Sequence, residues 1–242
     1  MDIDLTQSQI IPGNALELLE SFPGESIDAV VTDPPYASLA DSIASDRRSS
    51  SAMYSSARRR TYPVLAGAGI SPVYFGKWLE SWFRECFRIL KPGGFFYCFM
   101  DWRGLSAVCE EAAISGFRQD GIFVWHKTNG RPLQGKHRQS CECVWLGRKP
   151  GDCVKENREV FGKGFVSTAV VPEKDRCHLT QKPDALMDEL ISVLPAAAVV
   201  LDPFAGSGST VVACKRTGRV GIGIECVPEY AEIAQKRISE AN

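Results

Sequence analysis

The chain has 242 residues, 44% of them hydrophobic, and a formal net charge of −1 at pH 7. That length can bury a substantial core, and we expect one α/β domain over residues 1–242. No apolar run approaches the ~20 residues that a membrane helix needs, and the N-terminus lacks a signal-peptide pattern. Composition therefore argues against membrane and secreted classes and predicts a soluble cytoplasmic protein.

Charge is distributed unevenly along the chain. Residues 37–63 hold five arginines against two aspartates, and residues 127–176 hold eleven lysines and arginines against six acidic residues. Together these segments carry +8 and leave −9 on the remainder of the chain. A basic face on an acidic body is what a polyanion binder needs, although a charge run is more often just a solvated surface.

Predicted strands and helices alternate along the chain. The first strand and a short helix fall within residues 10–22, and the apolar, β-branched run that follows has the composition of a central parallel strand. Alternation of this kind predicts a doubly wound, mainly parallel sheet. The expected elements from that run onward are strand 27–32, helix 75–90 ended by a turn at 91–94, strand 95–100, helix 103–115, strands 121–126 and 140–146, helix 184–193, strand 198–201, helix 209–216, strand 220–225 and helix 228–239.

Two stretches lack the periodicity of regular structure. Residues 37–72 contain eight serines between Ser38 and Ser56 and a triple-arginine cluster, and we interpret them as a mobile loop insertion. Residues 127–177 are basic and, outside the strand at 140–146, weakly periodic, which indicates loops or a small appended region.

Nine cysteines are scattered through the sequence, several of them within apolar patterns. Reduced thiols are the default for such spacing. The tightest cluster is Cys141-Glu142-Cys143, with Cys153 and Cys177 further on, but there is no Cys-x-x-Cys pair. We therefore predict no metal site.

Asp33 ends the predicted central strand and is followed by Pro34, Pro35 and Tyr36. Neither proline can donate a hydrogen bond to a sheet, and Pro34 drives the residue before it into an extended conformation. These residues are therefore expected beyond the sheet edge, where open α/β sheets bind ligands. Alone they could be only a strand with a rigid turn, but a second strand that ends in Asp-Pro occurs at Asp202.

A glycine loop, Asp-Pro-Phe-Ala-Gly-Ser-Gly-Ser-Thr, covers residues 202–210 between a predicted strand and a helix. Its glycines let the backbone approach a ligand, which the N–H groups of the helix start would face. A P-loop needs lysine where Ser209 stands, and a dinucleotide fingerprint needs glycine where Val211 stands. Glu225 ends the next strand, where a carboxylate can accept both hydroxyls of a ribose. A nucleoside ligand is implied; the alternative is a helix-capping loop followed by a surface glutamate.

At these residues the chain resembles the amino-methyltransferases of DNA, in the permuted order that places the catalytic Asp-Pro-Pro-Tyr first and the cofactor loop last. The resemblance covers nearly the whole chain. It implies a Rossmann-like S-adenosylmethionine-dependent methyltransferase fold with a seven-stranded sheet that includes an antiparallel hairpin strand. The matching blocks, in order, are Gly13-Asn14-Ala15-Leu16, residues 32–36, residues 90–94, Trp125-His126-Lys127, His178-Leu179-Thr180-Gln181-Lys182-Pro183, residues 202–210 and Glu225.

The resemblance also implies roles for individual residues. Asp33 and the carbonyl of Pro34 would accept hydrogen bonds from the exocyclic amine of a flipped base, with Pro35 completing the motif and Tyr36 stacking on the base. S-adenosyl-L-methionine would be the cofactor. Its binding residues would be Asn14, Ala15, Asp33, Thr180, Lys182, Asp202, Phe204, Ala205, Gly206, Ser207, Gly208, Thr210 and Glu225.

The partner implied by the resemblance is double-stranded DNA, with a homodimer as a further expectation, in an enzyme of restriction–modification or phage type. Asp before Pro-Pro-Tyr favours adenine N6 in this family, with cytosine N4 as the alternative. Residues 127–177 would be a small target-recognition region, and DNA contacts are expected at Arg58, Arg59, Arg60, Arg131, Lys136 and Arg138. Two other classes stay open, a nucleic-acid-binding module without turnover and a P-loop hydrolase.

Overall fold

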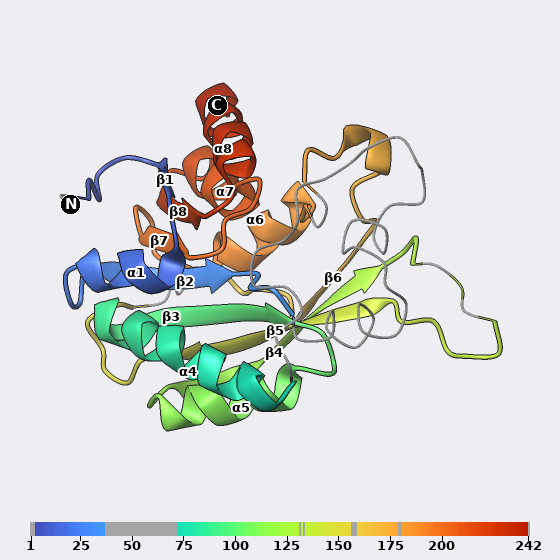
Figure 1. Cartoon of the computed structure of the whole chain (residues 1–242), viewed down its shortest axis with the longest axis horizontal. Helices are drawn as coiled ribbons and strands as arrows, with labels where there is room; N and C mark the ends of the chain where they lie inside the picture. The colour runs from blue at the N-terminus through green and yellow to red at the C-terminus, as the bar shows by residue number, and fades with distance from the viewer. Residues whose placement is uncertain are drawn as a thin grey trace.

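The computed structural model describes residues 3–36, 72–130, 132, 134–155, 159–178 and 181–241. Within these residues, strands and helices alternate along most of the chain (Figure 1). The strands are β1 (Gln9–Pro12), β2 (Ile27–Thr32), β3 (Leu90–Met100), β4 (Arg118–Lys127), β5 (Cys141–Arg148), β6 (Phe165–Thr168), β7 (Val199–Asp202) and β8 (Val220–Glu225). The helices are α1 (Ala15–Leu18), α4 (Pro72–Ile89), α5 (Leu105–Ile114), α6 (Asp184–Ser192), α7 (Ser209–Arg216) and α8 (Pro228–Glu240), with short 3-10 turns at Leu19–Ser21 and Glu173–Asp175.

The described strands form one eight-stranded sheet in the order β1-β8-β7-β2-β3-β5-β4-β6. All pairings are parallel except the two made by β5, which runs antiparallel to β3 and to β4. The predicted α/β class and its antiparallel hairpin strand are confirmed. The sheet has one strand more than the seven expected, because β6 pairs with the outer edge of β4.

Helices cover both faces of this sheet, α1, α4 and α5 on one side and α6 and α7 on the other (Figure 1). Strand β2 contributes to both cores: Val30 packs with the first helix group, whereas Ala29 and Val31 pack with the second. Successive side chains of a strand point to opposite faces, so the unbroken apolar run over residues 29–31 is what a central strand covered on both faces requires.

Helix α4 shows the spacing that predicts an amphipathic helix. Leu79, Trp82, Phe83 and Cys86 recur at helical intervals and are buried against the sheet, whereas Arg84 is exposed. Among the helices of the described segments, none combines the length and apolar character needed to cross a membrane.

Several boundaries differ from the sequence prediction; β4, for example, begins at Arg118, three residues before the expected start, and β5 continues to Arg148, two residues past the expected end. Helix α4 begins at Pro72, three residues before the expected start, and β3 begins directly after it at Leu90. The predicted turn at 91–94 is instead an irregular part of β3, where the register against β2 shifts and Lys91 pairs with Asp28 at 2.7 Å. Strand β6 lies in a stretch expected to be loop, because four residues at a sheet edge are too few for a periodic signal.

The arrangement of the central strands positions two loops together. Strand β2 lies between β7 and β3, and all three are parallel, so their carboxyl ends meet at one edge of the sheet. Asp33 follows β2 and Asp202 ends β7. The Thr32 hydroxyl donates to Oδ1 of Asp202 at 2.8 Å and links the two strand ends directly.

Candidate active site

A cavity of about 1120 Å³ opens at this edge of the sheet. Its volume exceeds the ~300–1,000 Å³ typical of a site for one small molecule, so there is room for two ligand moieties. It is lined by predicted site residues from several elements, namely Asn14, Ala15, Asp33, Pro34, Pro35, Tyr36, Lys182, Asp202, Phe204, Ala205, Gly206, Ser207, Thr210 and Glu225. The structure thus brings together the segments that the sequence motifs single out.

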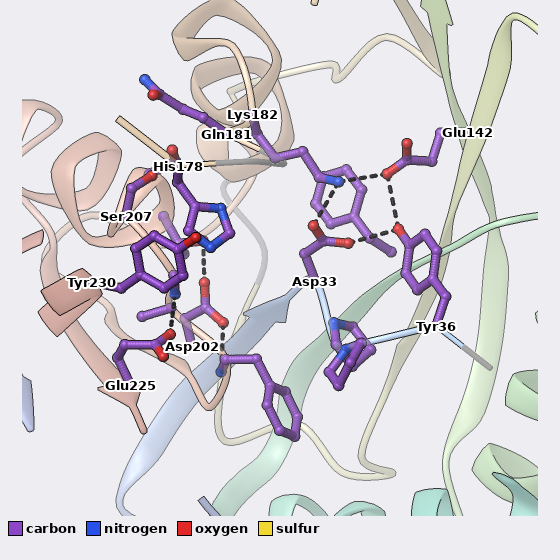
Figure 2. A pocket seen from close by; sticks show the side chains of 18 of the residues that line it. Asp33, Tyr36, Glu142, His178, Gln181, Lys182, Asp202, Ser207, Glu225 and Tyr230 are labelled. Atoms are coloured by element: carbon purple, nitrogen blue, oxygen red, sulfur yellow. Dashed lines mark hydrogen bonds and ion pairs between the residues drawn. The ribbon is translucent and has the colours of Figure 1, made fainter. Parts of the chain in front are cut away.

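One half of the cavity contains a group of ionised and hydroxyl side chains, which we call the Asp33 cluster: Asp33, Tyr36, Lys127, Glu142 and Lys182. The Lys182 ammonium lies 2.7 Å from Oδ2 of Asp33 and 2.6 Å from Oε1 of Glu142. The Tyr36 hydroxyl lies 2.6 Å from Oδ1 of Asp33 and 2.9 Å from the same Glu142 oxygen (Figure 2). Lys127 pairs with the other Glu142 oxygen. Each side chain of the cluster therefore has a polar partner.

Burial and neighbouring charges set the ionisation of the cluster. Burial raises the pKa of Asp33, opposed by the ammonium of Lys182. Burial also acts to raise the pKa of Glu142, but Lys182 and Lys127 together lower it to about 2. The pKa of Lys182 is raised by the two carboxylates against the effect of burial, and that of Tyr36 lies well above its usual value through burial and the same carboxylates. At neutral pH, Glu142 and Lys182 are charged and Tyr36 is neutral.

Sequence reasoning did not select Glu142. It lies on β5. Glu142 and Val144, two positions apart on the same face of the strand, are buried, whereas the preceding residue Cys141 is exposed. A charged residue at an inward position of an alternating strand is itself a signal, because buried carboxylates occur almost only when paired. Register places it beside Lys127: β4 and β5 are antiparallel, with Trp125 opposite Glu142.

The other half of the cavity is built on the glycine loop. Asp202 accepts hydrogen bonds from the Phe204 amide at 3.1 Å and the Thr210 hydroxyl at 2.6 Å, in addition to Thr32. Burial nevertheless raises its pKa to about 6. Asp202 therefore spans the loop from its start to the first turn of α7 and holds its shape.

Glu225 receives backbone donors on both oxygens. The Gly206 amide donates to Oε2 at 2.7 Å and the Val227 amide donates to Oε1 at 2.8 Å. Burial raises the pKa of this carboxyl, opposed by those amides. The Cys226 thiol also lies 3.8 Å from Oε1, whereas Oε2 has two lone-pair directions and retains acceptor capacity for a ligand in the cavity.

Gly206 allows the buried His178 ring to lie against the loop. Its φ is +53°, and an added Cβ would lie 3.1 Å from Cε1 of His178. His178 in turn packs edge-on to Tyr230 of α8 (Figure 2), and burial lowers its pKa to about 4. The blocks 178–183 and 202–210, distant in sequence, are therefore adjacent in space.

These features fit a nucleoside-bearing cofactor. A glycine loop whose Gly206 has a left-handed φ and lies against His178, a carboxylate with spare acceptor capacity and the apolar Phe204 ring, which contacts Trp78 at 5.5 Å between centroids, all face one cavity. Phe204, Gly206 and Glu225 would hold the base and ribose portions, as aromatic faces and strand-end carboxylates do in dinucleotide sites.

Two other residues predicted to bind the cofactor, Gly208 and Asn14, also have structural roles. Gly208 is not among the described residues that line the cavity: its φ is +76°, and an added Cβ would lie 3.0 Å from Cβ of Ala234, so it permits α8 to approach. Asn14 lines the cavity and also caps α1 by accepting from the Leu16 amide at 3.1 Å.

The predicted DNA contacts are only partly placed. Lys136 and Arg138 are exposed in the connection between β4 and β5, beside Gln139 and Gly130, which line the cavity. Thr180, Arg131 and the Arg58-Arg59-Arg60 cluster lie outside the described residues, as does nearly all of the predicted loop 37–72.

A doubly wound sheet with a nucleoside-type cavity across its parallel strand ends defines a class of α/β enzymes that includes the S-adenosylmethionine-dependent methyltransferases. Within that class, the N6/N4 DNA methylase family matches residues 27–236. The chain belongs to this family. Membership confirms the predicted DNA amino-methyltransferase and its cofactor, S-adenosylmethionine.

Individual relatives agree with the family over nearly the full chain. YubD of Escherichia coli (strain K12), a candidate methylase, is 29% identical over 96% of this chain and 90% of its own length. The type II methyltransferase M.HpaI of Haemophilus parainfluenzae is 28% identical over 97% of this chain and 75% of its own. The crystal structure of the M1.HpyAVI–SAM complex matches with a TM-score of 0.70 and 26% identity, covering 96% of this chain and 99% of that one.

Proposed function

We propose that this protein transfers a methyl group from S-adenosylmethionine to the exocyclic N6 amine of adenine in double-stranded DNA, with the base flipped out of the helix. The family includes N6 and N4 enzymes, so membership leaves the base open. Support for adenine comes from Asp33 before Pro-Pro-Tyr, since the related enzymes with aspartate at that position usually act on adenine and those with serine on cytosine.

One observation carries the proposal. The Asp33 carboxylate and the glycine loop face the same cavity from adjacent parallel strands. A base amine held at Asp33 and a cofactor held on the loop would therefore meet within one site. Holding two reactants in this way makes an otherwise bimolecular step effectively intramolecular.

The chemistry requires these residue types. An amine conjugated into an aromatic ring is a poor nucleophile, and two acceptors directed at its hydrogens draw the nitrogen toward a pyramidal geometry with a free lone pair. We assign these acceptors to Asp33 and the Pro34 carbonyl, whose orientation the proline ring restricts, and stacking of the base to Tyr36. When bound, the cofactor supplies an electrophilic methyl on its sulfonium. Orientation and polarisation then suffice, with no covalent intermediate.

DNA would lie across the open side of the cavity. Lys136 and Arg138 are exposed next to cavity residues of the 127–177 region, and positive side chains there can contact phosphates. We propose this region as the target-recognition region, acting together with the arginines of residues 37–72.

The test is methyl transfer followed by base analysis. Purified protein is incubated with unmethylated genomic DNA and methyl-labelled S-adenosylmethionine, and the DNA is digested to nucleosides. Label in N6-methyladenine supports the proposal, and label in N4-methylcytosine assigns the other base of the family. Cofactor binding without transfer to any DNA would indicate a binding module instead.

A further inference from the structure

Glu142 is a buried carboxylate that no sequence motif and no step of the proposed chemistry uses. Its side chain is 7% exposed, and its two oxygens contact three donors from separate segments: Lys182, Lys127 and the Tyr36 hydroxyl. Removing a carboxylate from water costs several kcal/mol unless its partners compensate. Its position within the cavity therefore calls for a role beyond packing.

Asp33 and Glu142 share the same two donors. The Lys182 ammonium is 2.7 Å from one carboxylate and 2.6 Å from the other, and the Tyr36 hydroxyl is 2.6 Å and 2.9 Å from them. Figure 2 shows Lys182 and Tyr36 on opposite sides of the gap between the two acids. Tyr36 has a single hydroxyl proton, so it can donate fully to only one of them at a time.

Both oxygens of Asp33 are engaged by these donors, and an incoming amine must compete with them. An ammonium on Asp33 also makes its carboxylate a weaker acceptor, because nearby positive charge lowers its basicity. If Glu142 were absent and the Asp33 carboxylate exchanged Lys182 for the amine of the base, Lys182 would be a buried ammonium without a carboxylate partner. That state is costly. With Glu142 in place, both donors keep an acceptor throughout.

Glu142 is well held for this purpose. It lies on β5, which pairs with strands on both sides, and Lys127 binds the oxygen that does not contact Lys182. Its own position therefore does not depend on Asp33.

We propose that Glu142 is a positioning residue for methyl transfer: it retains Lys182 and the Tyr36 hydroxyl so that Asp33 is free to accept the amine of the target base. The inference rests on the proposed function, because it requires an amine at Asp33. Glu142 itself touches no reacting atom and acts through its two donors.

Several charged and titratable groups face Asp33. Lys182, Glu142 and Tyr36 contact it or its partners, Lys127 stands behind Glu142, and Asp202 and Cys98 lie on the flanking strands β7 and β3. Of these, Glu142 raises the pKa of Asp33 and Lys182 lowers it. Neutralising Glu142 removes the negative charge that raises the pKa of Asp33. It also leaves Asp33 as the only carboxylate paired with Lys182. Each of these two changes lowers the pKa of Asp33.

The test is the isosteric variant Glu142→Gln under single-turnover conditions with saturating S-adenosylmethionine and unmethylated genomic DNA. We expect the transfer rate to fall by roughly 10²-fold, as for other losses of substrate positioning, while the cofactor dissociation constant stays within about threefold of wild type. The acidic limb of the rate–pH profile, which reports protonation of Asp33, should move to lower pH. A variant that is merely less stable would not move it in that direction.

Asp28→Asn is the matched control. Asp28 is also a largely buried carboxylate paired with a lysine, Lys91, but it is not among the described residues that line the cavity. This variant should lose stability and keep the wild-type transfer rate and acidic limb.

A second readout needs neither cofactor nor DNA. In protein carrying ¹³C at the aspartate carboxyl carbons, Asp33 is assigned by comparison with Asp33→Asn and titrated by NMR. Its midpoint should fall by about one pH unit in Glu142→Gln, and it should be unchanged in Asp28→Asn. An unshifted midpoint would overturn the shared-donor arrangement.

The double variant Lys182→Met, Glu142→Gln tests whether Glu142 acts on methyl transfer through Lys182. In a Lys182→Met background, Glu142→Gln should lower the transfer rate by less than about tenfold, because the shared ammonium is already absent and only the Tyr36 hydroxyl still links the two acids. The same 10²-fold loss in both backgrounds would overturn the proposed route. So would a wild-type rate and pH profile in the single variant Glu142→Gln. A wild-type protein that methylates no DNA overturns the proposed function and, with it, the role of Glu142 in transfer.

Discussion

The two halves of the cavity are built by different means. The half built on the glycine loop, which we call the cofactor half, depends on short-range backbone geometry. Asp202 holds a loop whose other end is Thr210, and Glu225 binds the Gly206 amide 19 positions away. The Asp33 cluster depends on side chains from distant segments, with Tyr36 and Glu142 separated by 106 positions. A contiguous loop can be recognised as a motif, whereas a charge network becomes visible only after the strands are assembled.

The difference extends to electrostatics. In the Asp33 cluster, Lys182 and Lys127 lower the pKa of Glu142 to about 2, whereas burial outweighs Lys182 at Asp33 and raises its pKa. In the cofactor half, Asp202 and Glu225 receive neutral hydroxyl and amide donors, and burial raises the pKa of both. The Asp33 cluster is therefore suited to a change of hydrogen-bond partner at Asp33 while Glu142 stays ionised. The cofactor half is suited to holding a neutral ribose and base.

The largest effect is expected from Asp33→Ala, which breaks the Asp33 cluster alone. Transfer should fall by at least roughly 10³-fold, the scale of losing a directed group at a reacting centre. The cofactor dissociation constant should stay within about threefold, because Lys182 keeps Glu142 as a partner. Single-turnover transfer and calorimetric titration measure the two quantities. Wild-type transfer would remove Asp33 from its proposed role.

Glu225→Ala breaks the cofactor half alone. Loss of charge-assisted hydrogen bonds to a ribose should weaken S-adenosylmethionine binding by about 1.5–3 kcal/mol. Glu225→Gln, which retains one oxygen acceptor, should lose less. With saturating cofactor, transfer by both variants should recover most of the wild-type rate, in contrast to Asp33→Ala. An unchanged dissociation constant in Glu225→Ala would place this carboxylate outside the binding site.

The buried His178 ring makes stability depend on pH. Its pKa in the folded protein, about 4, lies below the ordinary 6.5, so between these values the unfolded chain binds more protons. The contribution of neutral His178 to folding stability is therefore present above about pH 6.5 and falls as pH is lowered through this window, by about 2 kcal/mol between pH 7 and pH 5. Chemical denaturation should show that His178→Phe lacks this component. An equal pH dependence in both proteins would contradict the assignment.

The smallest effect compares two glycines with similar backbone angles. Gly206 and Gly218 have φ values of +53° and +74°, but only Gly206 has a ring next to a would-be Cβ. Gly218→Ala should lose about 1–2 kcal/mol through its left-handed backbone alone. Gly206→Ala should lose about 1 kcal/mol more because His178 must move, and only this variant should weaken cofactor binding. Equal losses in stability and affinity would show that the ring contact contributes nothing.

Elements with strong local signals were predictable from the sequence. Helix α7 and strand β8 have the predicted bounds, because a glycine loop begins the first and a run of apolar residues between polar ends marks the second. Prediction was weaker where a segment depends on its neighbours. The turn expected at 91–94 is absorbed into β3, which continues through Gly93 because Lys149 pairs with that segment. Strand β6 exists as the partner of β4.

The sequence by itself determined the family-level chemistry of this protein. Asp33-Pro34-Pro35-Tyr36, the glycine loop and Glu225 are recognisable because local backbone geometry demands proline and glycine at particular positions. Tertiary structure alone decided which charges surround Asp33. Register between β4 and β5 sets Lys127 beside Glu142, and the packing of the segment before α6 brings Lys182 between the two acids. Such pairing depends on distances across the fold, which no spacing along the chain encodes.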